Sequence, residues 1–478
     1  MPAAPEYGRM KPPSSGISAG QAYPFERLFG AALSPLERFL RQATAGGIVL
    51  VATTVVTLIV ANSELGDGLE HFWEQPAGFT LGDWSLGQSL HHWVNDGLMA
   101  LFFLLVGLEL KREALVGELS SLKDAALPIV AAIGGMAVPA LIYLSVNPDG
   151  PAARGWGVPM ATDIAFAIGI LVLLASRVPR ALIVFLMALA IADDLGAVLV
   201  IALFYTADID QTALLDAAVA LGVLILLNRG GVRMRLPYWL VGLALWYFTA
   251  LSGVHSTVAG VLLAFTIPVR PKHTALEFET RVAQLLASFR RHAADPTTPS
   301  DTMRSHDMAT IASSLERAAQ AVQSPLQRTA HGLSAPVAFL ILPVFALANA
   351  GVDFRGADLL DNLAQPITLG ITLGLVLGKF IGIGGFSWLA VKFGIARMPA
   401  QVRWSHLLGA AWLGGIGFTM SLFISQLGFT DPEQLEQAKV GILFGSLVAA
   451  MLGLAWLLAC TAKPTGTRSS TDSPRVDA

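Results

Sequence analysis

The sequence predicts an all-α polytopic membrane protein with about twelve transmembrane helices. Of its 478 residues, 54% are hydrophobic and 14% are charged, whereas soluble domains are roughly a quarter charged. One or two soluble cores could not bury so much apolar surface. Twelve apolar stretches recur between short polar connections, and we place the spans at 46–62, 91–110, 125–145, 158–175, 181–204, 211–227, 237–250, 253–268, 334–350, 365–391, 404–427 and 438–460.

The basic residues predict the orientation of these spans. With both termini on one side, 27 of the 31 Lys and Arg residues fall on that side. Arg154, Arg355 and Lys439 fall on the other side, and Lys379 lies inside a span. By the positive-inside rule we expect both termini to be cytoplasmic. The net charge of -3 offers no basic surface for nucleic acid, and the single cysteine, Cys460, excludes internal disulfides and cysteine-based metal clusters.

Two tails and two long connections lie outside the predicted spans. Residues 1–40 and 462–478 are expected to be cytoplasmic tails, the first of them disordered. The outer connection 63–90 contains two short alternating runs around Gly82-Asp83, which predict a small extramembrane β-hairpin. The cytoplasmic connection 270–333 has helix-like patches at 275–293 and 309–321 on either side of the breaker run 295–300. It is either a solvated, partly disordered loop or a regulatory element.

Four charged residues lie where a bilayer disfavours them. Asp193 and Asp194 sit in the middle of one span, Lys379 is equally deep in another, and Asp163 follows a proline within a third. A charge at the bilayer centre costs at least ~2.5–3.5 kcal/mol on insertion scales, so such residues usually mark a functional site.

The adjacent carboxylates favour competition between protons and a cation. Asp193 and Asp194 point about 100° apart on a helix, yet both can line one aqueous cavity. Their mutual repulsion in a poorly solvated site favours retention of a proton, and a small hard cation with oxygen ligands can replace protons there. Alternatively, the pair is a structural salt-bridge partner of Lys379, and both interpretations bring the three charges together.

Two spans carry breaks near their centres. The first break is at 161–163, where Pro159 and Gly169 also interrupt the span, and the second is at Gly414–Gly417. Unwound backbone at membrane depth is tolerated where it is buried in protein or lines a cavity. The half-helices then bring positive and negative dipole ends to the midplane, where Asp163 can offset the former and Lys379 the latter. For the glycines, close helix packing is the plainer alternative.

Five motifs carry a family resemblance: Leu98-Met-Ala-Leu-Phe-Phe-Leu-Leu-Val-Gly-Leu-Glu-Leu-Lys-Arg-Glu113, Ala161-Thr-Asp-Ile-Ala-Phe-Ala167, Phe185-Leu-Met-Ala-Leu-Ala-Ile-Ala-Asp-Asp-Leu-Gly-Ala197, Ser252-Gly-Val-His-Ser-Thr257 and Gly415-Ile-Gly-Phe-Thr-Met-Ser421. Together they closely resemble NhaA-type bacterial sodium/proton antiporters, from about residue 40 to 461. The resemblance implies an antiporter domain at 41–461 in the bacterial inner membrane. It also implies inverted repeats near 125–204 and 365–460, whose two discontinuous helices cross at the midplane, and a homodimer joined partly by the hairpin.

Carried over by residue, the resemblance makes Asp193 and Asp194 the carriers of protons and of a transient Na+ ion. Thr162 and Asp163 support them, and Lys379 is the buried cation that balances dipoles and can itself release a proton. The implied activity is export of Na+ or Li+ in exchange for incoming protons, electrogenic and serving pH and sodium homeostasis. It needs no cofactor and no enzymatic step, and its partners are membrane lipid, the transported ions and a second copy.

Accessory and pH-sensing roles carry over less directly. Asp96 matches an acidic position near the external end of its helix, and Glu109 and Glu113 match acids of the family's pH-sensing funnel. Instead of sensing pH, these two glutamates could simply form a solvated face at the membrane boundary. The alternative for His255 is a local structural role. Before the span at 334 the chain departs from the family pattern, and His331 is the remaining candidate there.

Two other classes of protein keep acids in a membrane. An intramembrane aspartyl protease needs two carboxylates facing one peptide bond, usually from different helices, which the adjacent Asp193 and Asp194 do not suit. A sodium- or proton-coupled carrier of an organic solute needs polar groups shaped for that solute, and the sequence shows no Arg or amide cluster at the midplane.

Overall fold

The computed structural model describes residues 45–461 except 82–83, 118–120, 207–208, 295–305 and 356–358. The predicted tails 1–40 and 462–478 and the breaker run 295–300 therefore lie outside the described residues.

Helices dominate the described residues, which also contain one two-stranded antiparallel sheet. The N-terminal half contains α2 Ala45–Ala61, α3 Gly66–Glu74, β1 Pro76–Leu81, β2 Trp84–Ser89, α4 Leu90–His92, the π-helix η1 Trp93–Leu98, α5 Met99–Leu115, α6 Leu122–Val146, the 3-10 helix η3 Pro151–Met160, α7 Ile164–Leu173, α8 Arg180–Phe204, α9 Gln211–Arg229 and α10 Arg235–Leu251. The C-terminal half contains α11 Thr257–Thr266, α12 Ala275–Ala294, α13 His306–Val322, α14 Pro325–Pro336, the π-helix η4 Val337–Ile341, α15 Leu342–Asn349, α16 Leu359–Ala364, α17 Pro366–Leu373, the π-helix η5 Gly374–Gly378, α18 Lys379–Lys392, α19 Trp404–Leu413, α20 Phe418–Gly428 and α21 Pro432–Cys460.

The helices confirm a polytopic membrane protein. Eight helical stretches within the described chain are long and apolar enough to cross a bilayer, or ten if two bent helix pairs each count as one span. Helices α10, with 17 residues, and α11, with 10, lie where the two remaining spans were expected, but each is shorter than any of those eight stretches. The total of twelve therefore stays a prediction.

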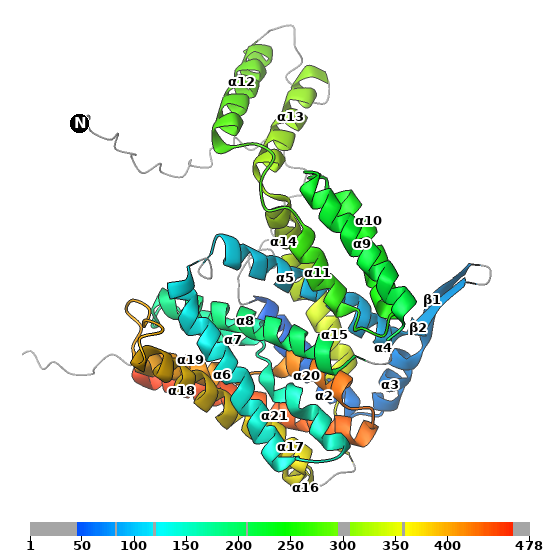
Figure 1. Cartoon of the computed structure of the whole chain (residues 1–478), viewed down its shortest axis with the longest axis vertical. Helices are drawn as coiled ribbons and strands as arrows, with labels where there is room; N and C mark the ends of the chain where they lie inside the picture. The colour runs from blue at the N-terminus through cyan, green and yellow to red at the C-terminus, as the bar shows by residue number, and fades with distance from the viewer. Residues whose placement is uncertain are drawn as a thin grey trace, which may run out of the picture.

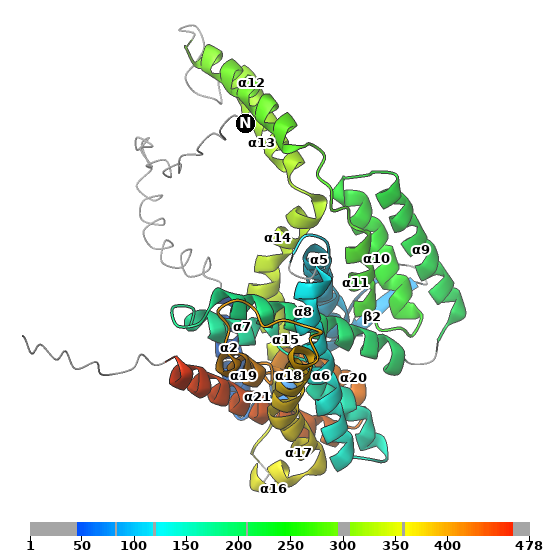
Figure 2. The same cartoon turned by 60° about the vertical axis from the view of Figure 1, so that its left-hand side comes forward.

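The helices form one body from which two elements project. Helices α12 and α13 pair with each other and extend away from the rest in both views (Figures 1 and 2). The β1–β2 hairpin reaches beyond the helices at the right of Figure 1. Leu81 pairs with Trp84, so β1 and β2 form the hairpin that the sequence predicted, while the predicted turn residues Gly82 and Asp83 lie outside the described residues.

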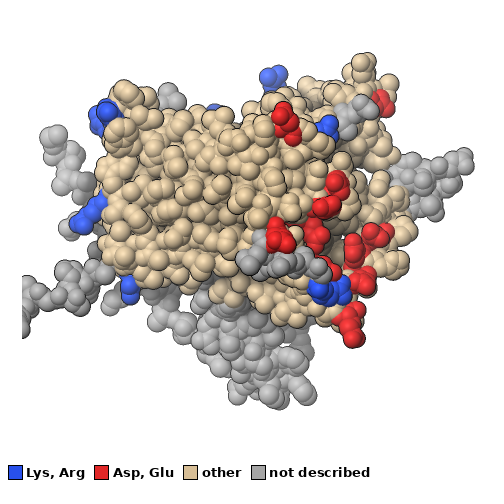
Figure 3. All heavy atoms as spheres, turned by 90° about the horizontal axis from the view of Figure 1, so that it is seen from below, with Lys and Arg blue, Asp and Glu red and all other residues tan. Residues whose placement is uncertain are grey.

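Charged side chains separate across the visible face of the body. In Figure 3, red Asp and Glu gather in the right half, most blue Lys and Arg lie toward the left and upper edges, and an uncharged surface lies between them. The acidic side is the side from which the hairpin projects in Figure 1. Such asymmetry is expected when the two ends of a bundle face different compartments.

Helices α6 and α18 pack closely because both carry glycine at their contact. A Cβ added to Gly134 would lie 2.4 Å from the carbonyl oxygen of Gly382, and one added to Gly382 would lie 2.2 Å from that of Gly134. Small residues allow such backbone contact between membrane helices. The contact fixes α18, whose first residue is Lys379.

Several sequence predictions about element bounds were wrong. The span placed at 158–175 begins earlier, at Pro151, and Gly169 lies inside the continuous helix α7 rather than interrupting it. The span placed at 334 begins at Pro325, because Ser324 and Gln327 form a capping box that starts the helix there. The outer connection contains the unexpected helix α3. In connection 270–333, by contrast, α12 and α13 confirm the two predicted helix-like patches, and the two helices pack against each other.

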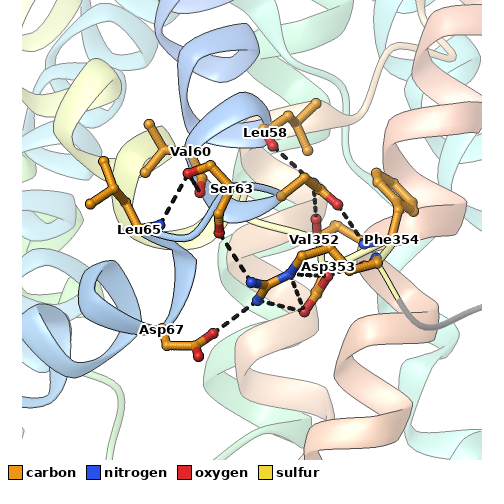
Figure 4. A network of polar contacts seen from close by, with 10 residues as sticks. Leu58, Val60, Ser63, Leu65, Asp67, Val352, Asp353 and Phe354 are labelled. Carbon is orange, nitrogen blue, oxygen red and sulfur yellow. Dashed lines mark hydrogen bonds and ion pairs between the residues drawn. The ribbon is translucent and has the colours of Figure 1, made fainter.

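A hydrogen-bonded network ties the turn after α2 to the segment after α15 (Figure 4). Arg355 donates to both oxygens of Asp353, to Asp67 at 2.8 Å and to the carbonyl of Ser63 at 3.0 Å. Asn62 donates to the carbonyl of Val352 and accepts from the N–H of Phe354. The hydrogen bonds from Arg355 lower the pKa of Asp353 and raise that of the guanidinium.

Candidate functional site

Both predicted helix breaks are present, and they are joined by hydrogen bonds. Helix η3 ends at Met160 and α7 begins at Ile164, while α19 ends at Leu413 and α20 begins at Phe418 after a bend of 46°. The N–H of Asp163 donates to the carbonyl of Ile416 at 2.6 Å. The hydroxyl of Thr162 donates to the carbonyl of Gly414, the C-cap of α19, at 2.8 Å. Backbone carbonyl groups that lack a helical hydrogen bond at the second break are therefore partly satisfied by donors of the first break.

Asp163 accepts hydrogen bonds at the start of both half-helices. Its Oδ1 accepts from the N–H of Phe166 at 3.0 Å, and its Oδ2 accepts from the N–H and hydroxyl of Thr419 at 3.1 and 2.5 Å. It is the N-cap of α7, and Thr419 lies in the first turn of α20. A carboxylate is favoured at such positive helix ends, as the sequence suggested for Asp163.

Lys379 bridges Asp193 and the first break. Its Nζ lies 2.5 Å from Oδ2 of Asp193 and 3.0 Å from the hydroxyl of Thr162, and both charged side chains are 0% exposed. Since Thr162 in turn donates to Gly414, the lysine reaches the end of α19 through Thr162. A π-helical turn, η5, directly precedes Lys379, and such turns are frequent at functional sites.

Asp194 is the least satisfied group of the site. It is 0% exposed, and among the residues that the structure describes neither of its carboxylate oxygens has a hydrogen-bond partner. Oδ1 of Asp193 also lacks one. A buried ionised carboxylate without a partner is strongly disfavoured. Asp194 therefore needs a proton or a cation, and Lys379 supplies one positive charge for three carboxylates.

Asp96 and His255 form a separate cluster at the hairpin end. Oδ1 of Asp96 lies 3.1 Å from Nε2 of His255, and Oδ2 lies 2.8 Å from Nε2 of His92. The His255 ring also packs edge-on against Phe423 of α20, with ring centroids 5.2 Å apart. The cluster thus contacts one of the broken helices. Sequence reasoning missed His92, although its spacing of four residues from Asp96 on a helix was visible.

The remaining candidates are more dispersed. Glu109 and Glu113 are half-buried on α5, which packs against α8, and Glu113 pairs with Arg112 at 2.9 Å. His331 is exposed on α14. The structure therefore joins Asp163, Thr162, Asp193, Asp194 and Lys379 in one site, while Glu109 and Glu113 lie on α5 and His331 lies on α14.

Fold and site together define a polytopic membrane protein with paired carboxylates beside two interrupted helices, the architecture of a secondary transporter. The family model described as Na+/H+ antiporter 1 matches residues 37–457. The Na(+)/H(+) antiporter NhaA of Syntrophobacter fumaroxidans is 60% identical over 435 residues, covering 91% of this chain and 92% of the relative. The NhaA of Acidithiobacillus ferrooxidans is 58% identical, covering 90% and 98%, and that of Helicobacter pylori is 46% identical, covering 89% and 95%. The chain belongs to the NhaA family of Na+/H+ antiporters.

Proposed function

We propose that this protein exchanges Na+ or Li+ for protons across a bacterial inner membrane and so serves sodium and pH homeostasis. The relatives named above are Na+/H+ antiporters, and the observation that carries the proposal is the unpartnered, fully buried carboxylate of Asp194 beside the Asp193–Lys379 pair. That arrangement requires a positive charge, which either a proton or a small cation can supply.

In the proposed cycle, a cation enters when Asp194 has lost its proton. It takes carboxylate oxygens from Asp193 and Asp194, and the approach of a second positive charge weakens the Lys379–Asp193 pair. Thr162 and Asp163 hold the two breaks together during this exchange. When protons return, the cation is released on the opposite side. If Lys379 also changes protonation, more proton charge than sodium charge crosses, and the exchange is electrogenic.

The finer architecture belongs to the same proposal. Two inverted repeats, near 125–204 and 365–460, would place η3–α7 and α19–α20 crossing at the midplane of a twelve-span fold. The mutual hydrogen bonds of the breaks support this arrangement. The separation of acidic and basic ends in Figure 3 supports a cytoplasmic location for both termini. The projecting β1–β2 hairpin is the proposed contact between two copies (Figure 1).

Proteoliposomes test the exchange directly. Addition of Na+ to vesicles carrying an acidic lumen should move protons out of the lumen, and a fluorescent pH probe reports this movement. Apparent affinity for Na+ should rise with pH, because protons compete for the same carboxylates. Asp194→Asn should abolish the signal, since an amide keeps the shape but cannot exchange charge. Wild-type exchange by this variant, or an affinity for Na+ independent of pH, would contradict the proposal.

A valinomycin-set potassium potential tests the charge balance. At fixed pH gradient, the exchange rate should change with membrane potential if more than one proton moves for each Na+. An exchange rate indifferent to potential would leave antiport intact and refute its electrogenic form.

A further inference from the structure

A cavity of about 250 Å³ lies at the hairpin end, between η1, α10 and the α10–α11 connection. Asp96, Trp93, Trp246 and Tyr247 line it together with His92 and His255, and both imidazoles face the carboxylate of Asp96. The exchange cycle described above uses none of the three aromatic rings. Their arrangement around one carboxylate therefore needs a separate account.

The two indole rings are fixed in place. Trp93 donates from Nε1 to the carbonyl of Ala77 at 2.8 Å, and Trp246 donates from Nε1 to the carbonyl of Asp96 at 2.9 Å. Their rings lie 6.0 Å apart at an interplanar angle of 25°. With both N–H groups bonded to protein, the rings contribute π-surface to the cavity without having to reorient on binding, and such preorganisation favours affinity.

The carboxylate of Asp96 can offer a ligand its negative charge, but few free hydrogen-bond acceptors. Each oxygen of Asp96 already faces an imidazole nitrogen, at 2.8 Å from His92 and 3.1 Å from His255. With both imidazoles neutral, the cluster carries one negative charge. A hard metal cation binds through oxygen ligands, and both oxygens of Asp96 are already engaged by imidazole nitrogens. A cation without N–H groups needs the negative charge and the rings alone, and aromatic rings around a carboxylate recognise quaternary ammonium groups.

We propose that this cavity binds a small quaternary ammonium cation of the choline type. The group is either a free solute or the headgroup of a lipid. The second source is sterically open, because an apolar cavity of about 220 Å³ continues from Trp93 and Trp246 along α5, α10 and α11. The proposal is independent of the antiport mechanism.

Equilibrium binding of radiolabelled choline to the purified full-length protein tests the site. The detergent is a maltoside, which has no quaternary ammonium group, and the pH is about 8.5, where an ordinary imidazole with a pKa of about 6.5 is neutral. Binding should be saturable with one site per chain. The neutral isostere 3,3-dimethyl-1-butanol should compete at least about tenfold more weakly, because it lacks the charge.

Variants localise the binding. Asp96→Asn and Trp246→Ala should each weaken choline binding by about tenfold. Trp246→Phe keeps an aromatic ring but loses the N–H, so it should bind choline more tightly than Trp246→Ala does. This variant separates the role of the ring from that of its hydrogen bond, and it replaces Trp246→Ala in the test if the alanine variant does not fold. Asp149→Asn and Trp388→Ala alter matched residues outside this cavity and should leave binding unchanged. No saturable binding, equal competition by the neutral isostere, or equal losses in Asp96→Asn and Asp149→Asn would overturn the proposal.

Nanodiscs identify the source of the ligand. If the lipid headgroup is the natural occupant, phosphatidylcholine should reduce binding of free choline relative to phosphatidylglycerol, and Asp96→Asn should remove that difference. Equal binding in both lipids, with the variant effects retained, identifies a free solute as the occupant.

Discussion

Two charged networks in this molecule hold a basic side chain against carboxylates, yet they differ in how completely they are satisfied. Arg355 lies at the surface and uses Nε, Nη1 and Nη2 to bind Asp353, Asp67 and Ser63 (Figure 4). Lys379 is fully buried and binds Asp193 and Thr162, while Asp194 next to this pair has no hydrogen-bond partner among the described residues.

The comparison separates a structural network from an exchanging one. At the surface, water competes for every charge, so an ion pair contributes little and is screened by salt. In the buried site, an unpartnered carboxylate is costly unless a proton or cation joins it. Incomplete satisfaction is therefore what allows the site near Asp194 to exchange one positive charge for another.

The largest effect on stability should come from Lys379→Ala. It removes the positive charge from a fully buried site and should lower the free energy of unfolding by roughly 3 kcal/mol or more, because an unpaired charge remains buried. Lys379→Arg keeps the charge and should be milder. Melting temperatures of the purified proteins measure both, with Lys392→Ala on the same helix as the control. Equal melting temperatures for wild type and both Lys379 variants would refute the structural role.

A smaller loss should follow from Thr419→Val. The hydroxyl donates to the buried carboxylate of Asp163 at 2.5 Å, and hydrogen bonds to charged groups contribute about 1.5–3 kcal/mol. The N–H of Thr419 keeps its own bond to Asp163, so the loss should be less than in Lys379→Ala. Thr372→Val, whose hydroxyl donates to a backbone carbonyl at 3.3 Å, is the matched control. If both threonine variants melt alike, Asp163 does not depend on this bond.

Arg355→Ala should have a still smaller effect. Its carboxylate partners Asp353 and Asp67 are solvent-exposed, so the melting temperature should fall less than in Thr419→Val, and the difference from wild type should shrink at high salt. Na+-driven proton movement should be unchanged. A fall as large as that of Lys379→Ala, or a loss of exchange, would show that the surface network does more than join two connections.

The smallest effect concerns the pH dependence of the same network. Because Arg355 lowers the pKa of Asp353 in the folded protein, ionised Asp353 stabilises the fold above the unfolded pKa of about 3.9. This contribution is lost as pH falls through the lowered folded value. The difference in melting temperature between wild type and Asp353→Asn should therefore shrink below about pH 4. If the difference in melting temperature grew on acidification, ionised Asp353 would destabilise the fold, and the prediction would be wrong.

Local chemistry in the sequence predicted the parts of the site that depend on neighbouring residues. Charges inside apolar runs identified Asp193, Asp194 and Lys379, and Pro159 with Thr162-Asp163 and the run Gly414–Gly417 located both breaks. The pairing of β1 with β2 followed from the two alternating runs around Gly82-Asp83, because hairpin signals are local in the sequence.

Features that depend on tertiary contacts were not predictable. No local pattern indicated the π-helical turns that the described residues contain, one of which precedes Lys379 and one of which contains Asp96. Thr419 stood within a quoted motif, but its bond to Asp163 joins residues 256 positions apart. The start of α14 at Pro325 was missed, because the polar residues of its first turns lack the apolar pattern of a membrane span. The helix nevertheless continues without a break into the span that was placed at 334–350.

Proton release on Na+ binding is the measurement that tests the central claim most directly. In weakly buffered detergent solution near neutral pH, addition of Na+ to the purified protein should acidify the medium by more than one proton for each bound Na+. The signal should saturate, fade at low pH where protons hold the site, and vanish in Asp194→Asn. Saturable Na+ binding without proton release, or undiminished release by Asp194→Asn, would contradict exchange at the Asp193–Asp194 pair.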